Sequence, residues 1–227
     1  MGAPHARILT EFTPIRPAAT LIVVREPRGR AQVLVGQRGT SAVFMPSKVV
    51  FPGGRVDPGD AHVPLAGELS ADCRARLLAG GGPSPDAHAA AAIRELWEET
   101  GQILGTSMEW SDPPHEWAPF AAAGFRPDAS GLAHVFRAIT PPGPKRRFDA
   151  RFFCVDAERL ASDPDDFSRA EDELSDLQWM PIDAARSFDL PLVTRLALAT
   201  VADRLPDLSV PSDVPFFDGD DAALGSG

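Results

Sequence analysis

The segment IRELWEETG, residues 93–101, holds carboxylates at a spacing that could bind a metal ion. On an α-helix, Glu95 lies one turn before Glu98 and Glu99, so all three carboxylates can face the same way. Like charges at this spacing repel by roughly 0.2–0.5 kcal/mol per pair, and a cation between them would remove that penalty. Mg²⁺ and Mn²⁺ prefer such oxygen ligands. The alternative is a solvated acidic helix face, and the triplet alone does not exclude it.

The residues around the triplet predict the helix that would present it. Asp86 is a candidate N-cap, and Gly101 is a suitable end for the helix. Arg94 lies four residues before Glu98 and can steady its carboxylate. Upstream, the FPGG run at residues 51–54 predicts a tightly bent backbone, where glycine lets a carbonyl oxygen approach an ion closely.

Together, the glycine run and the acidic helix resemble the signature of the Nudix hydrolase family, G-x5-E-x7-R-E-U-x-E-E-x-G-U, where U is aliphatic. Gly54 opens the signature, and its second half is filled without a gap by Arg94, Glu95, Leu96, Glu98, Glu99 and Gly101. The resemblance implies an α/β fold, an α/β/α sandwich with a mixed β-sheet. It also implies hydrolysis of a nucleoside diphosphate linked to another moiety, with water and a divalent cation.

The sequence departs from the signature in its first half and at its end. The acidic slot after Gly54 holds Asp60 instead of glutamate, and an insertion follows it at about residues 61–85. Asp86 lies at the right offset from the helix, so either aspartate could fill the slot; we favour Asp60, with Asp86 as the helix cap. Gln102 stands where an aliphatic residue is usual, and we expect little effect because the helix has ended.

The resemblance assigns roles to residues of this chain. Metal ligands would be the carboxylates of Glu95, Glu98 and Glu99 and the backbone carbonyl of Gly53, holding Mg²⁺ or Mn²⁺. The catalytic residues would be Glu98, Glu99, Arg94 and Glu173. Arg94 would orient the glutamates. Either one of the helix carboxylates or Glu173 would take the proton of the water. Glu173 lies six residues before Trp179 in RAEDELSDLQWMP, which resembles the acidic position that many Nudix proteins carry before a late strand tryptophan. A merely solvated acidic loop is the alternative for Glu173.

The substrate is less well defined by the sequence. Arg38 and Phe51 keep the register of the coenzyme A diphosphatase motif L-L-T-x-R-[SA]-x3-R-x3-G-x3-F-P-G-G, whereas its second arginine is missing. Arg147 and Arg151 belong to a basic cluster that could hold a terminal phosphate or simply solubilise a hairpin tip. We therefore expect a small nucleotide derivative as the partner, with coenzyme A as one candidate. A catalytically silent nucleotide-binding module is the alternative function.

Hydrophobic periodicity predicts the elements that would position these residues. Strands and helices alternate, which favours a mixed sheet between helices in one domain over residues 1–227. The predicted strands are 18–25 and 31–38 as a hairpin, 131–141 and 147–157 as a second pair, and the start of 174–187; the predicted helices are 64–78, 86–100 and 190–205. The tail from about residue 206 is expected to be loosely ordered unless Phe216 and Phe217 pin it.

Composition limits the partners and the compartment. The formal net charge of −10 argues against a general nucleic-acid surface, and no apolar run is long enough to span a membrane. Cys73 and Cys154 lack metal-ligand spacing and are expected to be free thiols in a reducing compartment. The N-terminus lacks the pattern of a signal peptide, so we expect a cytoplasmic protein. The insertion could be a lid, a dimer arm or a passive surface excursion, which leaves a homodimer open.

Overall fold

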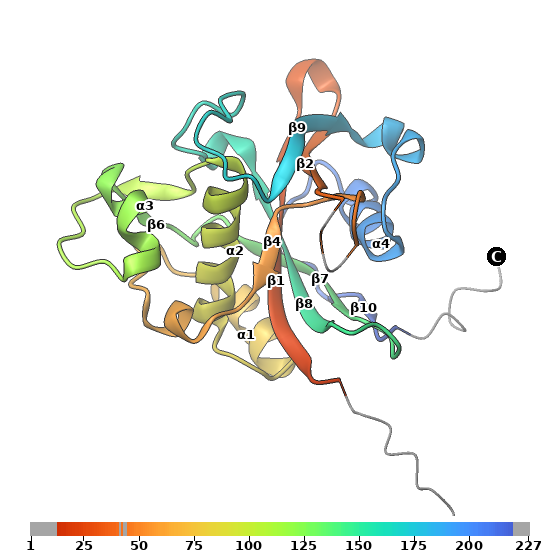
Figure 1. Ribbon diagram of the computed structural model, residues 1–227, viewed down its shortest axis with the longest axis horizontal. Coiled ribbons are helices and arrows are strands. Elements are labelled where there is room, and N and C mark those ends of the chain that lie inside the picture. The colour runs from red at the N-terminus through yellow and green to blue at the C-terminus, as the bar shows by residue number, and fades with distance from the viewer. Residues whose placement is uncertain (1–12, 41, 43–44, 220–227) are drawn as a thin grey trace, which may run out of the picture.

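The computed structural model describes residues 13–40, 42 and 45–219, which form a mixed sheet between helices (Figure 1). Helices α1 and α2 cover one face of the sheet, with α3 on the outer side of α2, and α4 covers the other face. The helices are α1 Ala71–Ala79, α2 Pro85–Thr100, α3 Ala118–Ala122 and α4 Leu192–Ala202. The strands are β1 Ile15–Arg25, β2 Gln32–Arg38, β3 Val49–Val50, β4 Gly53–Arg55, β5 Gly105–Ser107, β6 Phe125–Pro127, β7 Ala133–Ile139, β8 Arg147–Asp156, β9 Leu174–Pro181 and β10 Phe216–Phe217. The predicted α/β/α sandwich is confirmed.

The main sheet has eight strands, with the order β10-β7-β8-β1-β2-β3 and with β4 and β9 pairing to β1 and β2. The long β1 and β8 run parallel, as do β10 and β7, and the other pairs are antiparallel. Both predicted strand pairs are confirmed: β1 pairs with β2 and β7 pairs with β8. The tail crosses back to the sheet, because Phe216 lies opposite Arg137 on β7. Residues 220–227 lie outside the described residues.

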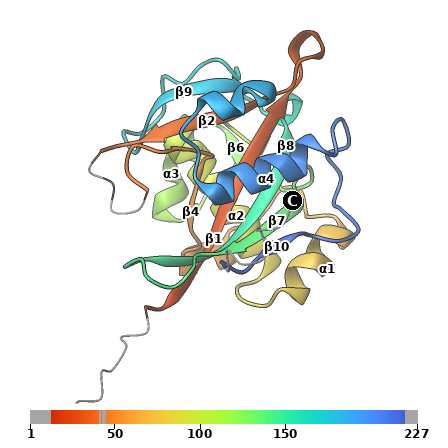
Figure 2. The same ribbon diagram turned by 90° about the vertical axis from the view of Figure 1, so that its right-hand side faces the viewer.

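The two faces of β1 belong to two separate cores. Ala19, Leu21 and Val23 pack under α2, whereas Ile22 and Val24 pack toward α4. This follows from the strand period of two, which sends neighbouring side chains to opposite faces. In Figure 2, α4 lies across its face of the sheet. Which face a strand residue occupies therefore decides whether it can reach the space beside α4.

The start of α2 differs from the prediction. Ser84 is the N-cap, and its hydroxyl accepts a hydrogen bond of 3.1 Å from the Ala87 amide. Pro85 occupies the first helical position, where its missing N–H has no consequence. Asp86 instead pairs with Arg74 of α1, at 2.8 Å. The predicted end is confirmed, because Gly101 adopts the left-handed conformation with φ 72°.

The insertion is part of the core, which corrects the expectation of a surface excursion. Its helix α1 begins only at Ala71, where Ser70 caps it, and not at residue 64. The buried apolar residues of the insertion are Val63, Leu69, Cys73 and Leu77. Arg151 of β8 donates hydrogen bonds to the carbonyls of Gly80 and Gly81 and so fastens the end of α1 to the sheet. Cys73 and Cys154 are free thiols, as predicted.

A buried histidine lies near Arg151. His134 of β7 is 2% exposed, and neither ring nitrogen has a hydrogen-bond partner among the described residues. Its ring packs against Phe153, with 5.9 Å between the centroids. Burial lowers the pKa of the imidazole to about 3, and the positive charge of Arg151 adds to the shift. His134 is therefore neutral in the folded chain at neutral pH.

Because His134 stays neutral in the folded chain, stability should fall as the pH is lowered. The ordinary pKa of 6.5 in the unfolded chain exceeds the folded value of about 3, so the unfolded chain binds more protons between them. The free energy of unfolding is unaffected by His134 above its ordinary pKa. At pH 5 protonation of His134 in the unfolded chain lowers the free energy of unfolding by about 2 kcal/mol. H134F should lose less stability than the parent between neutral pH and pH 5 in urea unfolding. Parallel pH profiles for the two proteins would contradict this.

Among the described residues, no helix combines the length and the apolar character that crossing a bilayer requires.

Candidate active site

The carboxylates predicted to bind metal lie where α2 packs against β4. Glu95 is 9% exposed and Glu99 is 2% exposed, so α2 turns both toward the sheet. The Gly53 amide donates a hydrogen bond of 2.8 Å to Glu99 Oε2, which ties the helix to the strand. A Cβ on Gly54 would overlap the Glu95 carboxylate. These glycines lie in the extended strand β4, not in the predicted bend, and they are needed because the carboxylates approach the backbone so closely.

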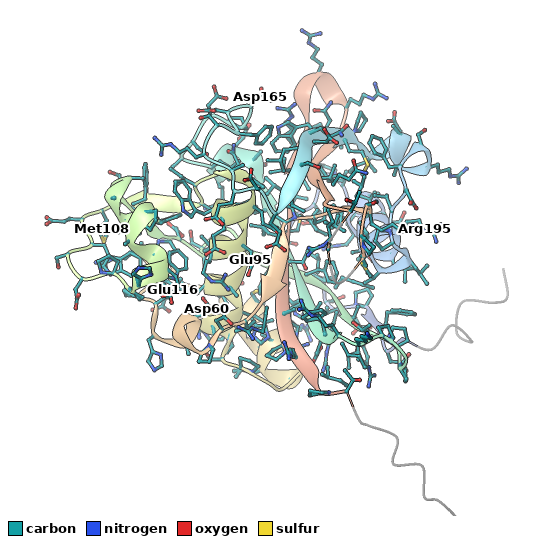
Figure 3. All side chains as sticks on the ribbon, viewed as in Figure 1. Asp60, Glu95, Met108, Glu116, Asp165 and Arg195 are labelled. Atoms are coloured by element: carbon teal, nitrogen blue, oxygen red, sulfur yellow. The ribbon has the colours of Figure 1, made fainter. Side chains whose placement is uncertain are left out.

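Arg94 holds the acidic residues together. Its guanidinium donates to Asp60 Oδ1 at 3.1 Å, Glu95 Oε1 at 2.8 Å and Glu98 Oε2 at 3.0 Å. A fourth hydrogen bond, of 2.9 Å, goes to the backbone carbonyl of Arg55. Figure 3 shows Asp60 and Glu95 near each other between α2 and β4. The structure therefore brings Asp60 to the site.

The two open alternatives for the acidic slot are separated by their partners. Asp60 is 3% exposed and contacts the buried Arg94. Its Oδ2 also accepts a hydrogen bond of 2.8 Å from the Asp57 amide, which fixes the 3-10 helix at Pro58–His62. Asp86 pairs with Arg74 at the far end of α2. Only Asp60 touches the carboxylate cluster.

The electrostatics of the cluster favour a bound cation. Burial raises the pKa of Glu95 to about 7, although the adjacent Arg94 opposes the shift. Burial and the negative charge of Glu95 raise the pKa of Glu99 well above its ordinary value. Burial also raises the pKa of Glu98, against the influence of Arg94. Arg94 pairs with Glu95 and Glu98 but not with Glu99, so the charge of the three carboxylates is incompletely balanced.

The cluster fits a hard divalent cation by its donor chemistry. Glu99 Oε1 is buried and has no hydrogen-bond partner among the described residues. An unpaired buried carboxylate oxygen is costly, and a cation bound by oxygen ligands would satisfy it. In the described part of the chain, no set of acidic, histidine or cysteine side chains is already arranged as a metal cage. Arg94 engages Glu95 and Glu98, so a cation would compete with it for their oxygens.

Glu173 reaches the site on the loop before β9. The Glu171 amide donates a hydrogen bond of 2.8 Å to the Glu98 carbonyl, which docks this loop on the end of α2. Glu173 pairs with Arg38 of β2 at 2.9 Å. Gln102 also holds the segment that leads to Glu173. Its fully buried side-chain amide donates hydrogen bonds to the carbonyls of Asp163 and Asp166 at 3.2 and 2.9 Å. The polar side chain at position 102 thus joins two distant segments.

A cavity of about 580 Å³ opens beside the cluster. Of the predicted site residues, it is lined by Arg38, Phe51, Gly53, Glu95 and Glu173. Arg147 and Arg151 do not line it. Arg147 donates to the Thr140 carbonyl, and the 1% exposed Arg151 lies on the α1 side of the sheet. The cavity instead receives the alternate residues of β8, which are Phe148, Ala150 and Phe152.

Sequence reasoning missed two cavity-lining arginines, Arg16 and Arg55, whereas a third, Arg146, belongs to the predicted basic cluster. Arg16 shares the cavity face of β1 with Ala18 and Thr20, so strand alternation was the available signal. That signal needs the inward face of β1 to be known. Sequence periodicity alone does not provide it, because β1 is apolar on both faces.

Comparison with known proteins shows the family of the chain. Residues 70–198, more than half of the chain, match the family model described as the NUDIX domain. The chain belongs to the NUDIX domain family. This Nudix domain is 29% identical over 178 residues to "Putative nudix hydrolase 7" of Caenorhabditis elegans. The match covers 73% of this chain and 51% of that protein, so the chain spans about half the length of this curated relative.

Solved structures share the fold of this Nudix domain. A NUDIX hydrolase from Alicyclobacillus acidocaldarius has a TM-score of 0.61 and 27% identity, with 88% of this chain and 99% of that chain covered. The NUDIX domain of Shewanella oneidensis NrtR, solved as a complex with ADP ribose, has a TM-score of 0.51 and 12% identity. That match covers 86% of this chain and 90% of the NrtR domain and bears on the fold alone.

The close approach of Gly54 to Glu95 makes a testable prediction for this Nudix domain. In G54A the added methyl group would displace the Glu95 carboxylate, so we expect activity to fall at least about tenfold and stability to fall by about 1–3 kcal/mol. The matched control is G59A, because a Cβ there meets nothing within 4 Å. Activity assays and urea unfolding would measure both effects. A G54A protein with the properties of G59A would contradict the proposed crowding.

Proposed function

We propose that this Nudix domain hydrolyses the diphosphate bond of a nucleoside diphosphate linked to another moiety, with Mg²⁺ or Mn²⁺ as cofactor. The observation that carries the proposal is the Glu95 carboxylate at the wall of a 580 Å³ cavity, one helical turn from the buried Glu99, which has one unpaired carboxylate oxygen. A cavity of this volume suits a nucleotide-sized ligand. Family membership supports the same chemistry.

We assign the ligand positions to Glu95, Glu98, Glu99 and the Gly53 carbonyl. When bound, the divalent cation supplies charge neutralisation at the phosphates and lowers the pKa of a water molecule. Arg94 holds Glu95 and Glu98 in place through hydrogen bonds of 2.8 and 3.0 Å. It acts as a positioning residue, since its guanidinium is buried and engaged on every side.

Arg38 and Glu173, which also line the cavity, complete the proposed active site. Arg38 Nε is a buried donor without a partner among the described residues, and its side chain lines the cavity. A phosphate oxygen would satisfy it through a charge-assisted hydrogen bond. Glu173 is 56% exposed and lines the same cavity, where it can accept the proton of the attacking water. Binding of phosphate by Arg38 would release Glu173 from their ion pair.

The moiety linked to the nucleoside diphosphate is a finer proposal. Coenzyme A stays a candidate because Arg38 and Phe51, which carry the resemblance, both line the cavity. ADP ribose is a second candidate, since it is the ligand of the NrtR domain that shares this fold. A cytoplasmic location stays a prediction from the sequence.

A substrate panel with the metal varied tests the proposal. Coenzyme A, ADP ribose, NADH and dinucleoside polyphosphates would be incubated with Mg²⁺, with Mn²⁺ and with EDTA. We expect cleavage at the diphosphate of at least one compound, and no cleavage with EDTA. Retained ligand binding without cleavage of any compound would favour a catalytically silent binding module instead.

A further inference from the structure

The cavity has a second polar feature, at the first turn of α4. Leu192, Val193 and Thr194 begin this helix and all three line the cavity. The first intrahelical hydrogen bond runs from the Arg195 amide to the Pro191 carbonyl, at 3.0 Å. The three preceding amides therefore have no acceptor within the helix. Pro191, the N-cap, offers no side-chain oxygen to cap them.

Thr194 provides a second, independent sign of a ligand. Its side chain lines the cavity although the residue is only 4% exposed. Its hydroxyl has no hydrogen-bond partner among the described residues, whereas the Thr200 hydroxyl of the same helix donates to Leu196 at 3.0 Å. With no partner in the described part of the protein, the Thr194 hydroxyl is free to hydrogen-bond with the contents of the cavity.

The charges around the cavity indicate that this partner is an anion. Amides at a helix N-terminus carry a partial positive charge and bind phosphate. Asp189, the acidic residue just before α4, is neutralised by Lys48 at 2.6 Å. Among the described residues, Arg16 and Arg146 line the cavity without an ion-pair partner. The cavity therefore offers more positive charge than its own carboxylates use.

The anion at α4 is distinct from the diphosphate to be cleaved. The carboxylate cluster belongs to α2, and α2 and α4 cover opposite faces of the sheet (Figure 1). Glu95 and Thr194 both line the cavity but come from helices on opposite faces of the sheet. We propose that the first turn of α4, with the Thr194 hydroxyl, binds a phosphate monoester on the substrate in addition to its diphosphate. That the phosphate monoester belongs to a substrate rests on the proposed function, whereas the phosphate-binding site itself does not.

Metal-free binding measurements test the site without relying on catalysis. Calorimetry would compare AMP with adenosine 2′,5′-bisphosphate and adenosine 3′,5′-bisphosphate, which differ from AMP by one phosphate monoester. We expect at least one bisphosphate to bind roughly tenfold or more tightly than AMP, since hydrogen bonds to charged groups are the stronger ones. Equal affinity of AMP and both bisphosphates would overturn the proposal.

Variants of α4 then locate the site. T194V removes the hydroxyl but keeps the shape, so it should lose roughly tenfold in bisphosphate affinity with AMP unchanged. T194S should restore the parent affinity, and T200V is the matched control because its hydroxyl bonds within the helix. Parent-like bisphosphate binding by T194V would overturn the proposal. Hydrolysis of NADPH and NADH tests the proposed function separately. If bisphosphate binding depends on Thr194 but neither compound is hydrolysed, only the proposed function is refuted.

Discussion

Replacing Glu99 with glutamine is expected to lower kcat/KM at least about a hundredfold, which corresponds to roughly 3 kcal/mol at the barrier. E99Q keeps the shape of the side chain but removes the charge that would hold a cation. The unpaired Oε1 and the Gly53 contact at 2.8 Å make Glu99 the residue most dependent on that cation. Metal titration by calorimetry should show weaker Mn²⁺ binding in parallel.

Stability should move in the opposite direction to activity in E99Q. Burial of Glu99 raises the pKa of its carboxyl, so the charged form is disfavoured when no cation is bound. A neutral glutamine should therefore leave the free energy of unfolding unchanged or increase it. The control is E116Q, an exposed residue that is not part of the cluster, with activity expected within about twofold of the parent. Parent-like activity of E99Q would contradict the assignment of Glu99.

Replacing Arg94 with methionine is expected to destabilise the fold by about 3–5 kcal/mol. The guanidinium is 7% exposed, and its loss would leave the 3% exposed Asp60 carboxylate and Glu95 without their cation. Burial alone would lower the pKa of Arg94, but the Asp60 hydrogen bond and the Glu95 charge outweigh burial and raise it. Urea unfolding would measure the difference, and activity should be lost because Glu95 and Glu98 lose their positioning residue.

Two further variants separate charge from packing at Arg94. R30M removes an exposed ion pair, between Arg30 and Asp183, and should leave the free energy of unfolding almost unchanged. Adding D60N to R94M removes the stranded carboxylate, so the double variant should be more stable than R94M alone. If R94M were no less stable than R30M, the ion pairs would not be the source of stability at this position.

The chemistry-bearing helix could be recognised from the sequence because its signals are local. The three- and four-residue spacing of Glu95, Glu98 and Glu99 and the stop at Gly101 depend only on helix geometry, and α2 confirms the helix. The strand pairs were predicted for the same reason, since alternation and turn residues lie within short segments. Asp60 was favoured over Asp86 from its place in the motif, and its contact with Arg94 is what the structure adds.

The tertiary structure decided which side chains reach the cavity. A shift of one residue along a strand moves a side chain to the other face, so the basic cluster of β8 could not be oriented from its sequence. The structure turns Arg151 toward α1 and leaves Arg146 at the cavity. It also pairs Gln102 with a loop some sixty positions later in the chain. Such contacts depend on how separate elements pack against one another. Local sequence patterns carry no information about which distant segments come together.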